Sequence, residues 1–580
     1  MTTTDIDVSN AAEALLAVLA ARGVDYIFGN AGTDFPPLIE ALAKASLGGA
    51  RAPKPVTVPH ENLGIAMAHG CYLATGRPQA LMLHVNVGTA NAICGLFNAA
   101  RENIPIFLAA GRTPINEDDA LGARSVFIHW GQEMFDQAGM LREVVKWEYE
   151  LRDPRQVEAV VDRGLSLAMS EPRGPVYLTL PREVLAGGAG RFSFRASSRR
   201  QPAAAPAPDA AAVAQAARWL AEAERPLIVT ASFGREADAV PLLSRLAERH
   251  ALPVVGYRPR YVFLPSDHSM HLGYEPGPLL PDADVILVLD CDVPWIPKLH
   301  KVNPAAKVIH VGADPLFSRY PMRTFPCDLA ITAASRLALA ALDDALATVA
   351  RPDRVAARRE RIMAQCAKQQ EARAAAVARM AGSPRLNPAR LADALNRVKR
   401  PDDIIVSESS LPVGFMGFTQ PGTYFGTSPA GGLGWGLGAA LGLKLGAPAR
   451  RVIAVVGDGS YMFGNPTPAH YVAAAYDLPV LTVIMNNRMW GAVRRATLAM
   501  YPDGAAAKVN RAPLTYLEPT PDYERIVEAS GGYGEKVASA DELPAALERA
   551  LHVVEHEGRQ AVLNVLTEYS DSEALSDARR

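Results

Sequence analysis

The chain has 580 residues, of which 49% are hydrophobic and 21% charged, and its formal net charge is −2. At roughly 150 residues per domain, this globular composition predicts three to four domains with cores of their own. The near-neutral charge gives no electrostatic reason to expect nucleic acid or an anionic membrane surface as a partner. Five scattered cysteines, with no Cys-x-x-Cys spacing, argue against a disulfide framework or a thiolate zinc site.

The first residues, "MTTTDIDVSNAAEALLAVLAARG", lack the basic region of a signal peptide. No segment reaches the roughly 18 apolar residues that a membrane span needs. We therefore expect a cytoplasmic protein with neither a membrane nor a nucleic acid as partner.

The first block, residues 1–190, alternates apolar runs with helical periodicity. Its strand candidates are "VDYIFGN", "PVTVPHEN", "ALMLHVN", "PIFLAAG" and "GPVYLTLP". A Pro- and Ala-rich linker, "SSRRQPAAAPAPDAAA", follows this block. The second block, residues 205–345, repeats the pattern with "PLIVTAS", "LPVVGY", "DVILVLDCD" and "KVIHVGAD".

Residues 350–385 are rich in charge and predict a solvated helical connector. The third block, residues 386–570, contains "DIIVSE", "RVIAVV", "VLTVIM" and "QAVLNVLTE". Alternating strands and helices predict an α/β fold with three doubly wound parallel-sheet domains. The first and third blocks resemble two versions of one plan.

The stretch that starts at Arg451 contains two apolar runs that end in polar residues. It reads "RVIAVVGDGSYMFGNPTPAHYVAAAYDLPVLTVIMNN", so one run ends at Gly-Asp-Gly-Ser and the next at Asn-Asn. Between them, "PAHYVAAAY" predicts a crossover helix that places the two strands side by side or nearly so. Asp458 and the Asn486–Asn487 pair are then expected at the carboxyl-terminal sheet edge, where open α/β sheets bind ligands.

These residue types fit a metal-bound diphosphate. Gly457 and Gly459 allow a tight turn and close approach to a ligand, and the amides after Asp458 can receive phosphate oxygens. A carboxylate and an amide oxygen are hard ligands that suit magnesium. Either motif alone is more simply interpreted as a turn or a loop. The two motifs together favour the metal–diphosphate interpretation.

With these motifs the chain resembles the thiamin-diphosphate enzymes of the pyruvate decarboxylase and acetohydroxyacid synthase superfamily. The resemblance covers almost the whole chain in the order pyrimidine-binding, central and diphosphate-binding domain. It implies thiamin diphosphate and Mg²⁺ as cofactors. It also implies that Asp458 and Asn487 bind the metal through their side chains and Met489 through its main-chain oxygen, while the cofactor also contacts Gly457, Gly459 and Ser460.

A second motif, "VPHENLGIAMAHGCYLATGRP", supports the resemblance. It implies that Glu61 bonds the cofactor aminopyrimidine and promotes the tautomer that activates the thiazolium carbon. The simpler alternative is that Glu61 is an ordinary first-turn helix acid.

Other segments resemble benzoylformate decarboxylase and acetolactate synthase-like enzymes. "FGNAGTDFPPLIEAL" implies that Asn30 lies at the substrate pocket and that Thr33 replaces a serine that binds the substrate carboxylate. "LMLHVNVGTANAICGLFNAARENIPIFLAAG" implies an active-site role for His84, in proton transfer. "GQEMFDQAGMLREVVKWEYEL" implies that Gln132 lies near the pocket. Without the resemblance, the simpler interpretation of His84 is a structural histidine.

The glycine-rich "SPAGGLGWGLGAALG" implies that Leu433 bends the cofactor so that its two rings meet. "VSESS" implies that Ser410 contacts the diphosphate. Core packing and a turn cap are the respective alternatives for Leu433 and Ser410.

Two departures from the family bear on specificity. The adjacent His-His pair of pyruvate and indolepyruvate decarboxylases is absent, and Ala492 and Val493 stand where those enzymes carry a glutamate after Asn-Asn. An acetaldehyde-releasing enzyme is therefore disfavoured. We expect an apolar substrate-pocket wall made by Met489, Trp490, Ala492 and Val493.

The resemblance implies a lyase or carboligase acting on a 2-oxo acid, through decarboxylation or an acetolactate synthase-like ligation. The alternatives are an acyl-CoA-using relative of the oxalyl-CoA decarboxylase or 2-hydroxyacyl-CoA lyase type, a flavin-containing oxidase, and a cofactor-binding homologue without turnover. FAD is weakly disfavoured because the central block lacks a complete Gly-x-Gly-x-x-Gly fingerprint. A homodimer or homotetramer is expected, with active sites at the subunit interface.

Overall fold

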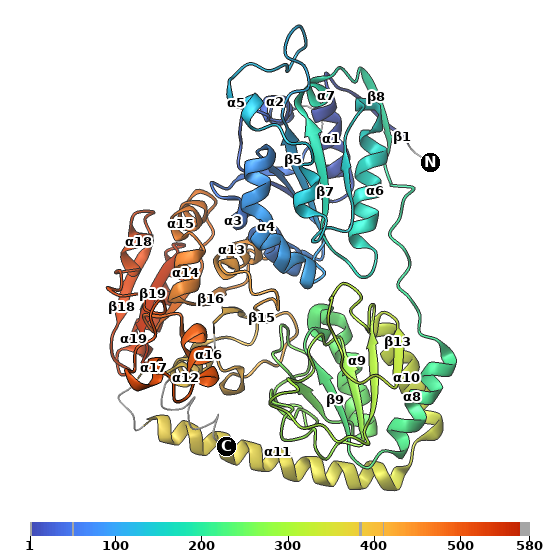
Figure 1. Ribbon diagram of the computed structural model, residues 1–580, viewed down its shortest axis with the longest axis vertical. Coiled ribbons are helices and arrows are strands. Elements are labelled where there is room, and N and C mark those ends of the chain that lie inside the picture. Colours follow the sequence, from blue (N-terminus) through green and yellow to red (C-terminus); the bar gives the residue numbers. More distant parts are fainter. Residues whose placement is uncertain (1–2, 49–50, 382–385, 410, 569–580) are drawn as a thin grey trace.

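The computed structural model describes residues 3–48, 51–381, 386–409 and 411–568. Three α/β domains follow one another along the chain, and a long helix lies beneath the second and third (Figure 1). Each domain has its own parallel sheet, so the predicted α/β class with three parallel-sheet domains is confirmed. In the described part of the chain, no helix combines the length and apolar character that a membrane crossing requires.

The first domain contains a six-stranded parallel sheet. In spatial order its strands are β3 (Lys54–Thr57), β2 (Tyr26–Gly29), β4 (Gln79–Leu83), β5 (Ile106–Arg112), β7 (Val176–Pro181) and β6 (Glu148–Glu150). Its helices are α1 (Ala11–Ala21), α2 (Pro36–Ser46), α3 (Glu61–Thr75), α4 (Val85–Arg101), α5 (Ile128–Gly131), α6 (Val157–Met169) and α7 (Arg182–Ala186). An antiparallel pair, β1 (Thr3–Asp7) and β8 (Arg191–Arg195), returns the chain to this domain after residue 190.

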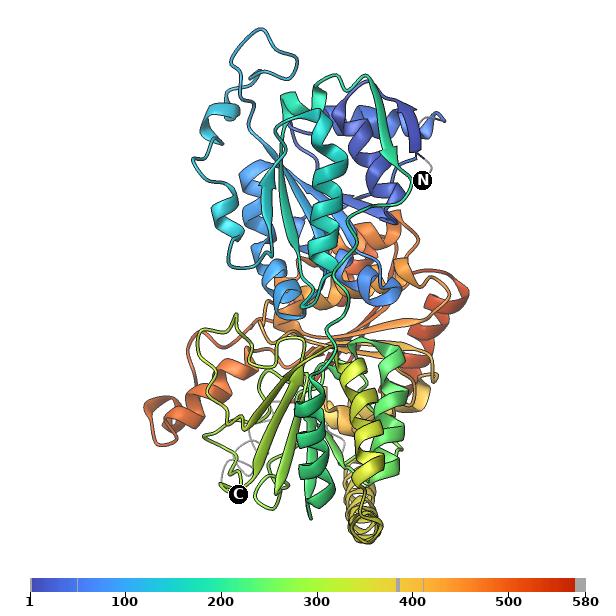
Figure 2. The same cartoon turned by 90° about the vertical axis from the view of Figure 1, so that its right-hand side faces the viewer.

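The central domain has a five-stranded sheet. Its order is β10 (Val254–Gly256), β9 (Pro226–Thr230), β11 (Val285–Leu289), β12 (Lys307–Gly312) and β13 (Leu329–Thr332). It is flanked by α8 (Ala210–Glu222), α9 (Val240–His250) and α10 (Ser335–Val349). The expected charged connector contains α11 (Pro352–Ala381), which is seen end-on at the base of the molecule in Figure 2.

The third domain repeats the strand order of the first. Its sheet runs β15 (Tyr424–Gly426), β14 (Ile404–Glu408), β16 (Val452–Gly457), β17 (Leu481–Asn486), β19 (Ala561–Leu566) and β18 (Tyr533–Val537). Its helices are α12 (Pro388–Val398), α13 (Trp435–Gly446), α14 (Asp458–Phe463), α15 (Pro466–Ala475), α16 (Gly491–Met500), α17 (Ala505–Lys508), α18 (Glu524–Glu528) and α19 (Leu543–His556). When the strands of each sheet are numbered in chain order, both sheets have their second strand at one edge and their fifth at the other.

One hydrophobic core joins the first and third domains through α3 and α13. Small residues let these helices touch backbone to backbone, because a Cβ at Gly442 would collide with the main-chain oxygen of Met67. A Cβ at Gly70 would meet the main-chain oxygen of Ala439 in the same way. The two sheets are therefore held rigidly against each other within one chain.

Candidate active site

The carboxyl-terminal edge of the third sheet brings the two polar motifs together. β16 ends at Gly457 and pairs with β17 in a register that sets Gly457 opposite Met485. Asp458 begins α14 directly after β16, and Asn487 follows the last residue of β17. Neighbouring strands lie about 4.8 Å apart, so both side chains belong to one small region of the sheet edge.

Asp458 is a buried carboxylate with spare capacity to bind. Its exposed fraction is 2%, and its Oδ2 atom has no hydrogen-bond partner among the described residues. Burial raises the pKa of this carboxyl to about 6, and the backbone N–H groups of Gly459, Arg488 and Met489 oppose the rise. A buried oxygen without a partner costs free energy, which a bound cation would recover.

The two residues of the Asn-Asn pair differ in burial and in their hydrogen bonds. Asn486 is fully buried, and its amide donates to Thr520 Oγ1 and Asn564 Oδ1, both at 3.0 Å. Asn487 is only half-buried, and its Oδ1 accepts from the Met489 N–H at 3.1 Å. A carboxylate, an amide oxygen and the Met489 carbonyl form an all-oxygen donor set, which suits magnesium.

The glycines of this motif allow close packing. A Cβ at Gly459 would collide with the indole ring of Trp490, so this ring covers the first turn of α14. The half-buried Ser460 lies in the same turn. Ala492 and Val493 lie on α16 and are exposed, so they do not form a closed pocket wall within this chain.

Leu433 is half-buried in a glycine-rich segment that is held from both sides. Asn98 of the first domain donates to the Gly432 carbonyl at 2.7 Å and accepts from its N–H at 3.0 Å. Glu408 accepts from the N–H groups of Gly434 at 2.7 Å and Gly436 at 2.5 Å. Burial raises the pKa of Glu408 to about 8 against the opposing effect of these donors. Ser410 lies outside the described residues.

In the first domain, Glu61 begins α3 and is 5% exposed. The amide of Asn30 donates to its Oε1 at 2.9 Å, and the amide of Asn91 donates to its Oε2 at 3.0 Å. Neutral amide donors fix the orientation of the carboxyl group, and no cation forms an ion pair with it in the described part of the chain.

His84 lies between an acid and an amide. Its Nδ1 is 2.5 Å from Asp34 Oδ1, and the Gln132 amide donates to its Nε2 at 3.2 Å. Nε2 is thus an acceptor, so the ring proton is on Nδ1 and is donated to Asp34. Asp34 is 2% exposed and therefore fixes this tautomer from a rigid position.

Thr33 contacts a second histidine. His129 is buried, its Nδ1 accepts from the Ser125 N–H at 3.2 Å, and its Nε2 is 3.1 Å from Thr33 Oγ1. The ring proton is therefore on Nε2 and points at the threonine oxygen, which leaves the hydroxyl proton of Thr33 free for a ligand. Burial, together with Arg182 and Arg124, lowers the pKa of His129 and keeps it neutral.

The predicted residues therefore form two groups. Asn30, Thr33, Glu61, His84 and Gln132 lie at the edge of the first sheet, and Asp458, Asn487, Met489 and Trp490 lie at the edge of the third. Within the described ranges, no hydrogen bond or ion pair joins the two groups.

The sequence interpretation missed several partners of these residues. Asp34 directly follows Thr33 in the turn between β2 and α2, so its position beside a predicted site residue could have identified it. Asn91, Asn98, His129 and Glu408 gave none, because their contacts depend on how distant segments pack.

The corresponding edge of the central sheet fits a flavin dinucleotide poorly. The cavity there measures about 90 Å³, against the roughly 300 Å³ or more of ordinary small-ligand sites. Arg260 fills part of the space and pairs with Glu102 at 2.8 Å and with Asp292 at 3.2 Å.

Family models match all three domains. They are described as the thiamine pyrophosphate enzyme N-terminal TPP binding domain (residues 9–140), central domain (213–342) and C-terminal TPP binding domain (410–565).

Curated relatives match over nearly the whole chain. Benzoylformate decarboxylase of Pseudomonas aeruginosa is 28% identical, over 92% of this chain and 95% of its own length. The acetolactate synthase isozyme 3 large subunit of Escherichia coli is 26% identical, over 95% and 93%. Sulfoacetaldehyde acetyltransferase of Rhodobacter capsulatus is 27% identical, over 93% and 91%.

Solved structures share the fold. The thiamine diphosphate-dependent 4-hydroxybenzoylformate decarboxylase of Rhodococcus jostii RHA1 has a TM-score of 0.76 and 23% identity, over 97% of this chain and 100% of that one. Benzoylformate decarboxylase from Polynucleobacter necessarius has a TM-score of 0.77 and 21% identity, over 97% and 99%. Together, the three matched domains and the full-length relatives place this chain in the thiamine pyrophosphate enzyme family, among the enzymes of the decarboxylase and acetolactate synthase type.

Proposed function

We propose that this protein is a magnesium-dependent 2-oxo acid decarboxylase or carboligase that uses thiamin diphosphate. The observation that carries the proposal is the buried Oδ2 atom of Asp458, which has no hydrogen-bond partner among the described residues and lies at the sheet edge that also carries Asn487 and Met489. These three groups would hold Mg²⁺, and the cofactor diphosphate would complete its coordination.

When bound, thiamin diphosphate supplies an electron sink for the bond that breaks next to the substrate carbonyl. Glu61 would hold the aminopyrimidine through a carboxyl group that Asn30 and Asn91 orient. Leu433 would support the bend between the two rings from a segment anchored by Asn98 and Glu408.

The other residues of the first domain would act on the substrate. The free hydroxyl proton of Thr33 would be donated to the substrate carboxylate. His84 Nε2, an acceptor fixed by Asp34, would bind a proton and return it. Decarboxylation converts R–CO–CO₂⁻ and a proton to R–CHO and CO₂. Ligation consumes the same oxo acid and proton with an acceptor R′–CHO and gives R–CO–CH(OH)–R′ and CO₂.

A complete site requires the two groups of residues to meet, and we propose that they do so between subunits of a homodimer or homotetramer. Large apolar side chains are exposed near both groups: Val87 and Phe97 on α4, and Met462 and Phe463 on α14. A second copy of the chain would bury these side chains.

The test is to prepare cofactor-free protein and supply thiamin diphosphate and Mg²⁺ singly and together. A panel of 2-oxo acids, with and without an acceptor aldehyde, is scored separately for CO₂ and for ligated product. We expect turnover only with both cofactors present. Turnover without Mg²⁺, or cofactor binding without turnover of any 2-oxo acid, would contradict the proposal.

A further inference from the structure

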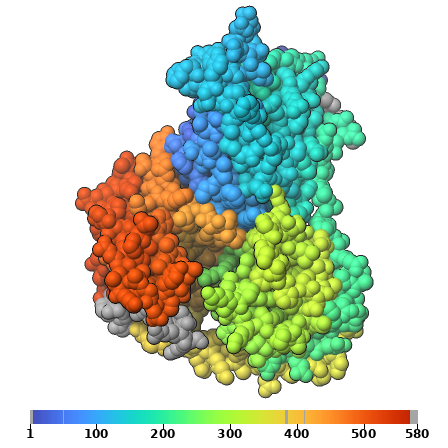
Figure 3. Space-filling model, viewed as in Figure 1, coloured from blue at the N-terminus to red at the C-terminus, as the bar shows by residue number. Residues whose placement is uncertain are grey.

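A cavity of about 780 Å³ lies between the central and third domains. Figure 3 shows the surface hollowed between the green central domain and the orange-red third domain. Three parts of the chain line it: the central-domain segment 257–275, one side of α11, and, in the third domain, residues within 407–409 and 411–427. This volume is in the range of sites that enclose a small organic ligand.

The cavity reaches the sheet edge that carries Asp458. β14 pairs with β16 so that Glu408 lies opposite Val456, which sets Ser409 level with Gly457 on the next strand. Ser409 is part of the cavity wall. On the other side of β14, the Gly426 N–H donates to the Arg260 carbonyl at 2.8 Å, which anchors the segment containing Arg258 beside β15. Arg258 is thus about three strand spacings, or roughly 14 Å, from the strand of Asp458.

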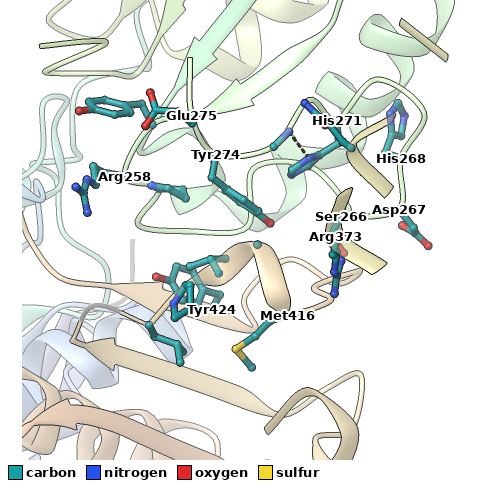
Figure 4. A pocket seen from close by; sticks show the side chains of 18 of the residues that line it. Arg258, Ser266, Asp267, His268, His271, Tyr274, Glu275, Arg373, Met416 and Tyr424 are labelled. Carbon is teal, nitrogen blue, oxygen red and sulfur yellow. Dashed lines mark hydrogen bonds between the residues drawn. The ribbon is translucent and has the colours of Figure 1, made fainter. Parts of the chain in front are cut away.

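Two arginines bring positive charge to the cavity wall. Arg258 and Arg373 lie on opposite sides of the cavity, with Tyr274 between them (Figure 4). Both arginines are exposed, and neither forms an ion pair within the described residues. Of the two acids in the wall, Glu275 lies on the Arg258 side (Figure 4), where His300 Nε2, at 3.2 Å, and the Gly277 N–H already bond to its carboxylate. The other, Asp267, lies with Arg373 on the side away from Arg258 (Figure 4).

Two further observations indicate a ligand. Arg258 has a φ of 49°, a left-handed conformation that costs a non-glycine residue about 1–3 kcal/mol and that clusters at functional sites. The hydroxyl of Ser409 and the Nε2 atom of His271, both in the cavity wall, have no hydrogen-bond partner among the described residues. His271 Nδ1 accepts from the Gly273 N–H, so its Nε2 carries the proton and is an unused donor.

The floor between these polar groups is apolar. It is made by Leu411, Val413 and Met416, while the Tyr424 ring lies on the Arg258 side (Figure 4). Such a surface suits a short hydrocarbon chain that ends in a charged group.

We propose that this cavity binds the side chain of the substrate, and that Arg258 binds an anionic group at its end. The substrate class is then a 2-oxo acid with a second carboxylate. This inference rests on the proposed function, because the 2-oxo group must lie at the Asp458 edge while the second carboxylate reaches Arg258.

The test compares pairs of 2-oxo acids of equal chain length: 2-oxoglutarate with 2-oxopentanoate, and 2-oxoadipate with 2-oxohexanoate. The holoenzyme should show a kcat/KM at least about tenfold higher for the acidic member of a pair. Arg258→Gln should lower kcat/KM for that acidic substrate by about 10- to 100-fold, mainly through KM, and change the neutral member by about twofold or less. Arg218→Gln, an exposed arginine on α8, is the matched control and should change neither.

A second measurement separates this inference from the proposed function. Calorimetric titration with glutarate, which cannot react, should show binding that Arg258→Gln abolishes. If no 2-oxo acid is turned over but this binding is found, the proposed function fails and the anion site stands. A preference for the neutral substrates, or equal losses for both members of a pair in Arg258→Gln, would overturn the inference. A larger loss in Arg373→Gln than in Arg258→Gln would also overturn it.

Discussion

The first and third domains share one strand order but differ at the edge where ligands bind. The edge of the first sheet presents two carboxyl groups, two imidazoles, a hydroxyl and several amides, each already bonded to another member of this set. The edge of the third sheet presents a buried carboxylate oxygen that has no partner among the described residues. The first domain therefore has a preorganised set of proton donors and acceptors at this edge, and the third domain has a buried carboxylate oxygen that can still accept a ligand.

This difference suggests that the two domains have different roles. A satisfied hydrogen-bond network fixes tautomers and orientations, which proton transfer requires. A buried oxygen that lacks a partner is costly until a cation binds it. The third domain would hold the cofactor, and the first would act on the cofactor and substrate.

Asp458→Asn should have the largest effect. It removes the only carboxylate of the candidate donor set, so affinity for Mg²⁺ and thiamin diphosphate should fall and activity should drop by about 1,000-fold or more. Glu61→Gln should instead keep cofactor binding and lose turnover by about 10²–10⁴-fold. Calorimetry for cofactor binding and steady-state assays for turnover separate the two results.

Asp503→Asn, a change at an exposed residue after α16, is the control for Asp458→Asn and should behave as the wild type. Equal loss of cofactor binding in Glu61→Gln and Asp458→Asn would contradict the assignment of cofactor binding to the third-sheet edge and of turnover to the first-sheet edge.

Mixing these two variants tests whether the edges meet between subunits. In a heterodimer of Glu61→Gln and Asp458→Asn chains, one site combines both defects and the other combines two wild-type edges. Random mixing of co-expressed, differently tagged chains should therefore restore about a quarter of wild-type activity. If both edges of a site came from one chain, the mixture would stay as inactive as its parents.

Much of the fold followed from the sequence because buried parallel strands read as apolar runs. "RVIAVV" and "VLTVIM" became β16 and β17, adjacent and parallel as predicted. The strands that were missed are short or exposed. β15 has three residues, and β18 is half-exposed along most of its length, so neither produces an apolar run. α14 was missed because glycines at the start of a six-residue helix resemble a turn.

Fewer features of the candidate site than of the fold could be predicted from the sequence. Motifs with fixed spacing, such as Gly-Asp-Gly-Ser and Asn-Asn, pointed to Asp458 and Asn487 because chain topology alone brings them together. The partners of Glu61 and Thr33 could not be found in this way. Asn91 lies on the next helix and His129 lies 96 residues beyond Thr33, so only tertiary packing creates their contacts.

Asp34→Asn should have an intermediate effect, confined to the edge of the first sheet. A neutral amide holds the His84 Nδ1–H less strongly, so we expect kcat to fall by about 10- to 100-fold while cofactor affinity stays unchanged. The pH profile of kcat should shift, which a merely structural role would not cause. His84→Gln should lose at least as much activity as Asp34→Asn, and an unaltered pH profile in Asp34→Asn would contradict the assignment.

The smallest effect concerns Glu408, which fixes the segment that joins the two domains. Burial raises its folded pKa from 4.5 to about 8. Between these values the unfolded chain has released this proton and the folded protein has kept it, so the contribution to stability falls as pH rises and levels off above about 8. Glu408→Gln removes this titration and should reduce the loss of Tm between pH 5 and pH 8, whereas Glu528→Gln, at an exposed position on α18, should leave it unchanged. Because Glu408 accepts from Gly434 and Gly436 on either side of the α13 start, the variant should have the lower Tm at pH 5, where the wild-type carboxyl is protonated. A variant whose pH dependence matches the wild type would show that this carboxyl is ionised in the folded protein and that its two backbone donors outweigh burial.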